Sequence, residues 1–395
     1  MTTGMKWISV CGYIFSAAAC GRGISSDPGA PSPDATVGET GTLGMNDVTM
    51  LLGEDAEVFS PLLAKMSGVN GSGDFVPRDI YARIATSHGD IGNGYDEYEI
   101  LALRFDLCDR VAPVPCPDGA DGSLRVVFQP TAPVNIVTVA DVGLHAFYRL
   151  PAIDLPVVVS QLRTIARISS IDARVVLGSR SFLSGPATPA RETVQALLAT
   201  YAKPDRLIRL TLMGQDQRTS EPRTVFRGLE LHDGQMVDLQ IAGVASTEQD
   251  ISVSGDGSSY QVAPLADAPV GFATTLDAAA FAAAAPGDQR GALDALAAVD
   301  NPLLNTQATV QCVSCHVSTY LGNHRASAAD IELSGLPDAF HSSHNTRLLE
   351  GRATTQPRSL HALSWNDRDI EISQRAVNET ANVLDEIERR FPAAQ

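Results

Sequence analysis

The chain has few positive charges and almost no lysine. Its 395 residues carry 29 Lys and Arg against 46 Asp and Glu, a formal net charge of −17, and lysine occurs only at Lys6, Lys65 and Lys203. Binding to nucleic acid or to an anionic membrane surface needs a basic patch, so this balance argues against both kinds of partner. The apolar share of 44% is ordinary for a globular protein, and the length is enough for one large core or two moderate ones.

A hydrophobic run long enough to span a bilayer is missing near the N-terminus. Trp7–Phe15 is short, follows Met1–Lys6 with its single lysine, and precedes the small residues Ser16–Ala19. This order is typical of an export signal peptide, with a buried helix as the alternative. Cys20 follows directly, so the segment resembles a bacterial lipoprotein signal in which that cysteine is lipidated. Simple secretion stays open because Ala17 stands where the lipoprotein pattern prefers Leu.

A phosphate-binding loop and a catalytic constellation are also missing before residue 272. The Gly92-Asn93-Gly94 segment and the glycines around Gly71 lack the Gly-Lys-Ser/Thr ending of a phosphate loop. His145 lies among apolar residues and is interpreted as a core residue. We therefore expect a binding or structural role for this region, and we do not expect an enzyme.

The most informative motif is Cys312-Val313-Ser314-Cys315-His316. Cys-x-x-Cys-His is the attachment site of covalent c-type haem: the two thiols add to the porphyrin vinyl groups, and the adjacent imidazole binds the iron. The motif resembles that of c-type cytochrome domains; the rest of residues 272–395 is similar to them only in size and helical character. The resemblance implies one haem c, held by Cys312 and Cys315, with His316 as the proximal ligand. The region before residue 272 resembles no characterised family.

The remaining cysteines fit an exported protein. Cys108 and Cys116 close a short loop between two predicted strands, and in an oxidising compartment such a pair is expected to form a disulfide. The alternative is two unrelated buried thiols, because sequence alone does not fix their geometry.

Methionine is missing downstream of the motif, since the last one is Met236. Small electron-transfer cytochromes commonly use a downstream Met as the sixth iron ligand, so a histidine is the natural substitute. His361 is our first choice, ahead of His341 or His344, and an open sixth position is the alternative. Histidine on both faces is typical of a low-potential electron-transfer haem.

Two other interpretations of the motif compete with haem. Cys312 and Cys315 with His341 and His344 have ligand types that suit structural zinc. Alternatively, the two cysteines form an oxidised pair, structural or redox-active, although thioredoxin-like proteins place such a motif after a strand.

Apolar periodicity predicts an α+β protein. Period-2 patterns predict strands over 101–107, 124–128 and 208–212, and a hairpin around Asp233-Gly234. Helices are expected near 157–168, 192–201, 278–285 and 291–299, and a long amphipathic helix from about residue 370 to 391, capped by Asn366 or Asp367. The division that follows is a signal peptide (1–19), a disordered tether (20–44), an α+β domain with a mixed sheet (45–271) and a mainly helical, cytochrome c-like haem-binding domain (272–395).

Together these features predict an exported, lipid-anchored haem protein, periplasmic or attached to the outer membrane. Its expected role is electron transfer at the cell envelope with a redox partner protein that the sequence does not identify. Its expected contact with a membrane is through the lipid alone, and no nucleic acid is expected. The alternative is a non-redox envelope lipoprotein whose motif binds zinc or forms a disulfide.

Overall fold

The computed structural model describes residues 42–392, except for 53–63, 70–72, 86–93, 109–115, 118, 131–141, 170–176, 184–186, 217–222, 267–268, 345, 347–356, 358–359, 361 and 367–368. The predicted signal peptide, Cys20 and most of the tether lie outside these residues. The helices are α1 (Met45–Val48), α2 (Arg78–Ala85), α3 (Leu155–Ile168), α4 (Pro189–Tyr201), α5 (Phe272–Thr275), α6 (Ala278–Ala283), α7 (Pro286–Asp300), α8 (Cys312–Ala329) and α9 (Gln374–Arg390). None of the helices in the described part combines the length and apolar character needed to cross a membrane.

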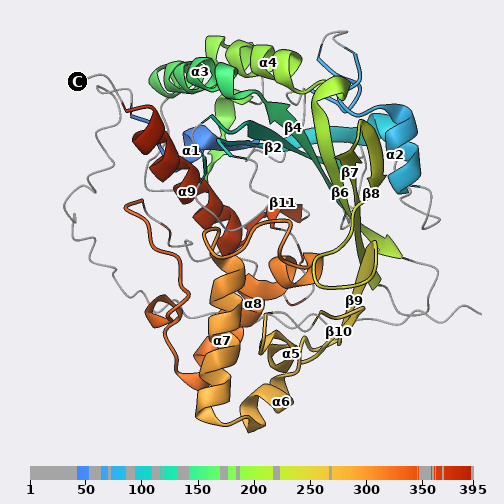
Figure 1. The fold of residues 1–395 in the computed structure, drawn as a ribbon, viewed down its shortest axis with the longest axis vertical. Helices are drawn as coiled ribbons and strands as arrows, with labels where there is room; N and C mark the ends of the chain where they lie inside the picture. The colour runs from blue at the N-terminus through green and yellow to red at the C-terminus, as the bar shows by residue number, and fades with distance from the viewer. Residues whose placement is uncertain are drawn as a thin grey trace, which may run out of the picture.

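One large sheet forms the centre of the described residues (Figure 1). Its ten strands are β1 (Thr49–Leu52), β2 (Tyr98–Asp106), β3 (Gly122–Pro130), β4 (Gly143–Leu150), β5 (Ser179–Arg180), β6 (Leu207–Asp216), β7 (Arg223–His232), β8 (Gln235–Asp238), β9 (Glu248–Val253) and β10 (Tyr260–Ala263). Their order is β10-β9-β7-β6-β4-β3-β2-β1-β5, with β8 paired to β7. All pairs are antiparallel except β1 with β5.

The predicted strands and the hairpin are present. The patterns at 101–107, 124–128 and 208–212 lie in β2, β3 and β6, and β7 turns into β8 through Asp233 and Gly234. Both turn residues have positive φ, 50° and 79°. These are the backbone angles for which an Asp-Gly hairpin turn is favoured. The α+β class predicted from the sequence is therefore confirmed.

The two faces of the sheet carry different side chains. On β3, Leu124, Val126 and Phe128 point to one face, because side chains alternate along a strand. Helices α3 and α4 cover this face (Figure 1), and their apolar sides join the same buried cluster. The other face receives α8, α9 and the two-stranded hairpin of β11 (Leu363–Asn366) and β12 (Asp369–Ile372).

Hydrophobic packing crosses the predicted boundary at residue 272. The first core cluster combines residues of β1–β4, β6, β7, α3 and α4 with Leu363, Trp365 and the apolar side of α9. The second combines α5–α8 with Met213, Phe226 and residues of β9 and β10. Elements after residue 272 are thus built onto the sheet, where they complete its second face.

The start of the C-terminal helix differs from the prediction. Helix α9 begins at Gln374, and the Ser373 hydroxyl caps it by accepting a hydrogen bond from the Ala376 N–H at 3.2 Å. Ile370 lies in β12 instead. Asn366 and Asp367 as caps were therefore wrong, because a period of seven across 370–391 does not separate a strand residue that happens to fit the spacing from the helix itself.

Candidate functional site

The motif occupies the first turns of α8. Cys312, Cys315 and His316 lie at positions i, i+3 and i+4, so their side chains share one side of the helix. These three are partly exposed, whereas Val313, Ser314 and Val317 are buried. The helix therefore packs its apolar side into the core and presents its three chemically active side chains on another, less buried side.

The N-terminus of this helix is held by a glutamine from the sheet. Gln311 precedes the helix without a side-chain cap of its own. Gln249 of β9, which is fully buried, accepts a hydrogen bond from the Val313 N–H at 2.9 Å and donates to the Gln311 side chain at 2.6 Å. A backbone N–H in the first helical turn has no partner within the helix, so an acceptor from another strand fixes both position and direction of the motif.

The sheet opposite the motif presents polar and aromatic side chains in register. Arg125 on β3 pairs across to Phe147 on β4, which pairs to Arg209 on β6, so the three share one face. Two residues before Phe147 on β4, His145 pairs with Thr211 of β6 on the same face.

Between this face and α8 lies a hollow with about 740 Å³ of empty space, counted out to where it opens to solvent. It is lined by the three motif side chains together with residues from the sheet and from 362, among them Arg125, His145, Phe147, Arg209, Thr211, Met213, Phe226 and Ala362. The motif thus faces a partly open hollow that is bounded by the sheet.

His316 is held in one orientation. Its Nδ1 lies 2.5 Å from the backbone oxygen of Leu360, and its ring lies against Phe226 with ring centroids 4.6 Å apart. Because a carbonyl oxygen only accepts hydrogen bonds, Nδ1 carries the proton and the lone pair of the neutral ring is on Nε2. Metal-binding histidines are typically oriented in this way, with the other ring nitrogen donating to a carbonyl.

The two motif thiols are free and uncharged. Burial raises the pKa of Cys312 to about 12 and that of Cys315 to about 11. Redox-active cysteines of the thioredoxin type depend on a lowered pKa, which neither thiol has. The local environment therefore gives no support to a reactive thiol pair.

Arg125 is a buried cation with two nitrogens that make no hydrogen bond. Its side chain lines the hollow and is stacked over Phe147, and the residue is only 7% exposed. The two nitrogens are Nε and Nη2, and burial together with the charge of Arg104 lowers its pKa to about 10. Hydrogen bonds from these nitrogens to an anion in the hollow would offset part of the cost of burying the guanidinium.

Behind the motif lies a network of buried charges that joins α9 to the sheet. Glu379 of α9 contacts Arg104 and pairs with Arg375 at 2.9 Å and Arg125 at 3.5 Å. Burial alone would raise the pKa of Glu379, but the guanidiniums of Arg104, Arg375 and Arg125 hold it well below its usual range. Glu379 therefore stays ionised.

Asp300, at the end of α7, is the second buried acid beside the motif. It accepts a hydrogen bond from the Ser318 hydroxyl of α8 at 2.6 Å. Burial raises its pKa to about 7, against the lowering effect of the Ser318 hydrogen bond and of Arg375. This carboxyl changes charge near neutral pH.

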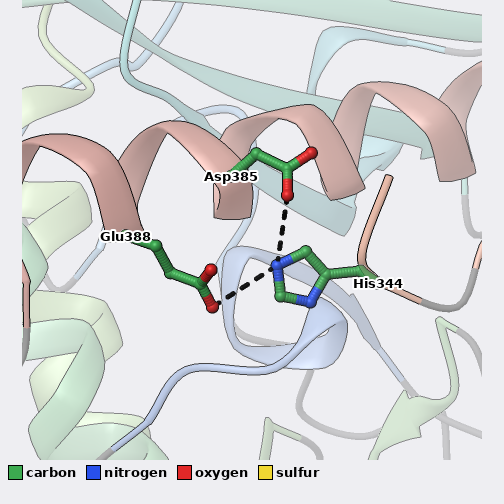
Figure 2. A group of neighbouring side chains, drawn as sticks. All are labelled: His344, Asp385 and Glu388. Atoms are coloured by element: carbon green, nitrogen blue, oxygen red, sulfur yellow. Dashed lines mark ion pairs between the residues drawn. The ribbon is translucent and has the colours of Figure 1, made fainter. Parts of the chain in front are cut away.

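The structure separates the histidines that the sequence grouped with the motif. His361 lies outside the described residues. His341 and His324 are exposed, and the His324 ring stacks on Tyr320 with centroids 5.5 Å apart. His344 points between Asp385 and Glu388 of α9 (Figure 2). None of the three lines the hollow.

The proposed zinc site of Cys312, Cys315, His341 and His344 is therefore not assembled in the described part of the chain. The group of three or more His, Cys, Asp or Glu side chains found there with converging ligand atoms is His344, Asp385 and Glu388. The reason is the path of the chain, since residues 341–344 pack against α9 and not against the start of α8. His341 and His344 as distal iron ligands stay predictions, and neither residue lines the hollow beside the motif.

The predicted disulfide is present. Cys108 and Cys116 are joined, with their Cα atoms 5.8 Å apart. Arg390, at the end of α9, donates to the Leu107 backbone oxygen at 3.0 Å and lies 3.7 Å from the Cys116 sulfur. The bridge thus closes the connection between β2 and β3 next to the last turn of α9.

Sequence reasoning missed the sheet residues of the site. His145 was interpreted as a core residue, yet it lines the hollow. Arg125 and Gln249 were not singled out from the sequence. One sign was available: on β3, Arg125 interrupts a strand whose other described residues are largely apolar, and an arginine in such a strand needs a reason.

Comparisons with known proteins add nothing to this picture, since no family model, curated protein or solved structure matches the chain.

Proposed function

We propose that the protein binds one covalent haem c in the hollow and serves electron transfer at the cell envelope. The observation that carries the proposal is the orientation of the motif: Cys312, Cys315 and His316 line one hollow, and His316 is fixed through Nδ1, so that the lone pair of its neutral ring is on Nε2. A helical C-terminal part that resembles cytochrome c domains belongs to the same proposal.

The residues of the hollow suit the group chemically. Cys312 and Cys315 would supply the two thioethers, His316 the proximal imidazole, and Arg125 a cation for a propionate. Bound haem supplies a one-electron couple between ferric and ferrous iron. The protein's part is to exclude water with Phe147 and Phe226 and to fix the imidazole through the Leu360 carbonyl.

A spectrum tests the proposal. The chain is exported in a bacterial host that has c-type haem attachment machinery, then purified, denatured and extracted with acidic acetone. We expect an intense Soret band that stays with the protein. A chain that is exported by this host but lacks the band contradicts the proposal.

Two variants locate the iron ligand. His316→Ala is expected to lower haem incorporation and shift the Soret band, whereas His324→Ala, an exposed histidine on the same helix, is expected to change neither. An unchanged spectrum in His316→Ala would contradict the assigned role.

Two residues of the sheet are further candidates for the sixth ligand, beside His361. His145 and Met213 both line the hollow, but Met213 is packed in the second core, whereas His145 is partly exposed to the space. We predict that His145 is the sixth ligand. His145→Ala should convert a low-spin ferric spectrum to a high-spin one, and Met213→Leu should leave it low-spin. The opposite pattern would assign Met213.

Export and lipid attachment belong to the same proposal and rest on the N-terminal sequence. Radiolabelled palmitate should be incorporated into the chain and lost in Cys20→Ser, with Cys11→Ser as the control. A protein that is exported but unlabelled would indicate simple secretion.

A further inference from the structure

Two carboxylates of α9 and one histidine from outside the helix are arranged as ligands of a single ion (Figure 2). Asp385 and Glu388 lie three residues apart on the helix and therefore share one side of it. His344, from the segment between α8 and α9, points its Nε2 between their carboxylates. The ligand atoms all lie within 4.8 Å of one another.

The distances fit a shared metal better than hydrogen bonds. Nε2 of His344 lies 3.6 Å from Asp385 Oδ1 and 3.5 Å from Glu388 Oε1. Atoms bound at ~2.1 Å around one tetrahedral ion are about 3.4 Å apart, whereas a hydrogen bond from a ring nitrogen to a carboxylate is about 2.7–2.9 Å long. The Nε2 atom is buried and makes no hydrogen bond in the structure.

The ligands are held in place by a second layer of hydroxyl groups. Ser342 Oγ donates to Asp385 Oδ2 at 2.8 Å and accepts from the His344 backbone N–H at 3.1 Å. Ser343 Oγ donates to Asp385 Oδ1 at 3.2 Å. Outer contacts of this kind orient the ligands of metal sites and strengthen binding.

We propose that His344, Asp385 and Glu388 form a binding site for a divalent transition metal of the zinc type. One imidazole and two carboxylates suit zinc, whereas calcium and magnesium prefer oxygen ligands alone. Three protein ligands leave the fourth position to water. The site is separate from the Cys312–His316 motif and does not depend on haem binding.

The metal joins two parts of the chain. His344 lies eight residues after Leu336 of the second core, and the two carboxylates belong to α9, whose apolar side packs in the first core. An ion bound to all three therefore stabilises the packing of residues 341–344 on α9.

Zinc titration tests the site. The mature full-length chain carries Cys312→Ser and Cys315→Ser in every sample so that the thiols do not compete, and zinc is titrated against a chromophoric chelator. We expect one zinc ion per chain, lost in His344→Ala and in Asp385→Asn. Ser342→Ala should weaken binding about 10- to 100-fold, because it removes only an outer contact.

The matched control is His341→Ala, which removes an exposed histidine three residues away and should bind zinc as tightly as the parent. Cobalt in place of zinc should give visible d–d bands that disappear in His344→Ala, while circular dichroism shows that the variant is folded. Absence of zinc binding, or binding that survives in His344→Ala, overturns the proposal. Competition by millimolar magnesium or calcium would also overturn it, since it would show an oxygen-only site.

Discussion

The two faces of the central sheet differ in the kind of side chain that they bury. On one face Leu124, Val126 and Phe128 meet the apolar sides of α3 and α4, and burial of apolar surface alone accounts for the packing. On the other face Arg125, His145 and Arg209 line a hollow next to buried charges. The first face is packed by apolar side chains, whereas the second combines apolar packing by α9 with buried polar and charged groups.

This difference predicts where substitutions act on folding and where they act on the cofactor. Substitutions on the apolar face should change the free energy of unfolding and leave the haem spectrum of the folded protein unchanged. Substitutions on the polar face should change the incorporation or the properties of the haem, in some cases together with the free energy of unfolding.

The largest effect is expected on the apolar face, from Phe128→Ala. Phe128 is fully buried and lies 6.3 Å from the Phe75 ring centroid. Removal of a buried Phe side chain costs about 3–5 kcal/mol of unfolding free energy through lost burial and the cavity left behind. Urea unfolding measures the loss; the spectrum of the folded fraction is expected to be unchanged. Ile153→Ala, exposed at the surface, is the control and should cost less than about 0.5 kcal/mol.

Asp300→Asn tests whether stability beside the motif depends on pH. The folded-state pKa of Asp300 is raised from 3.8 to about 7 by burial. Between these values the folded protein keeps a proton that the unfolded chain releases, so this carboxyl lowers the unfolding free energy as pH rises from about 4 to 7. The asparagine variant lacks that decline. Its unfolding free energy relative to that of the parent should therefore rise by on the order of 4 kcal/mol across this pH range.

Urea unfolding at pH 4, 5.5, 7 and 8.5 measures the difference between the two proteins. A destabilisation by the buried amide that is the same at every pH does not affect how the unfolding free energy changes with pH. Asp288→Asn, exposed on α7, should parallel the parent at every pH. Curves for Asp300→Asn that also parallel the parent would contradict the raised pKa.

The sequence predicted the apolar face well and the polar face poorly, for a physical reason. Alternating apolar residues in 101–107 and 124–128 mark strands because burial acts on each strand locally. The hollow depends on the register of β3, β4 and β6 and on which helix lies over them, and these are long-range results of the whole fold. The motif was visible because its residues have a fixed local spacing, whereas the place of His145 beside it depends on Cys312, a neighbour 167 positions away in the chain.

Gln249→Leu tests how the sheet positions the motif. The variant removes the acceptor for the Val313 N–H and the donor to Gln311, leaving buried polar atoms without partners. A cost of about 1–3 kcal/mol is expected. Because both thiols are in the first turn of α8, haem incorporation should fall as well. Gln261→Leu, exposed on the neighbouring strand β10, should alter neither; a Gln249→Leu variant with full haem content would show that the helix does not need this cap.

The smallest change in stability is expected at Arg125, and it should have the opposite sign. Arg125 is buried with two nitrogens that make no hydrogen bond, so Arg125→Met removes a desolvation cost and should leave the haem-free chain as stable as the parent or more stable by up to about 1 kcal/mol. With haem attached, loss of the cation next to the propionates should lower the reduction potential, because positive charge nearby favours the ferrous state. Redox titration measures the shift, and Arg149→Met, exposed on β4, should show none. A strongly destabilised Arg125→Met protein with an unchanged potential would mean that this arginine belongs to the structural charge network around Glu379, and that the two faces of the sheet differ less than their side chains indicate.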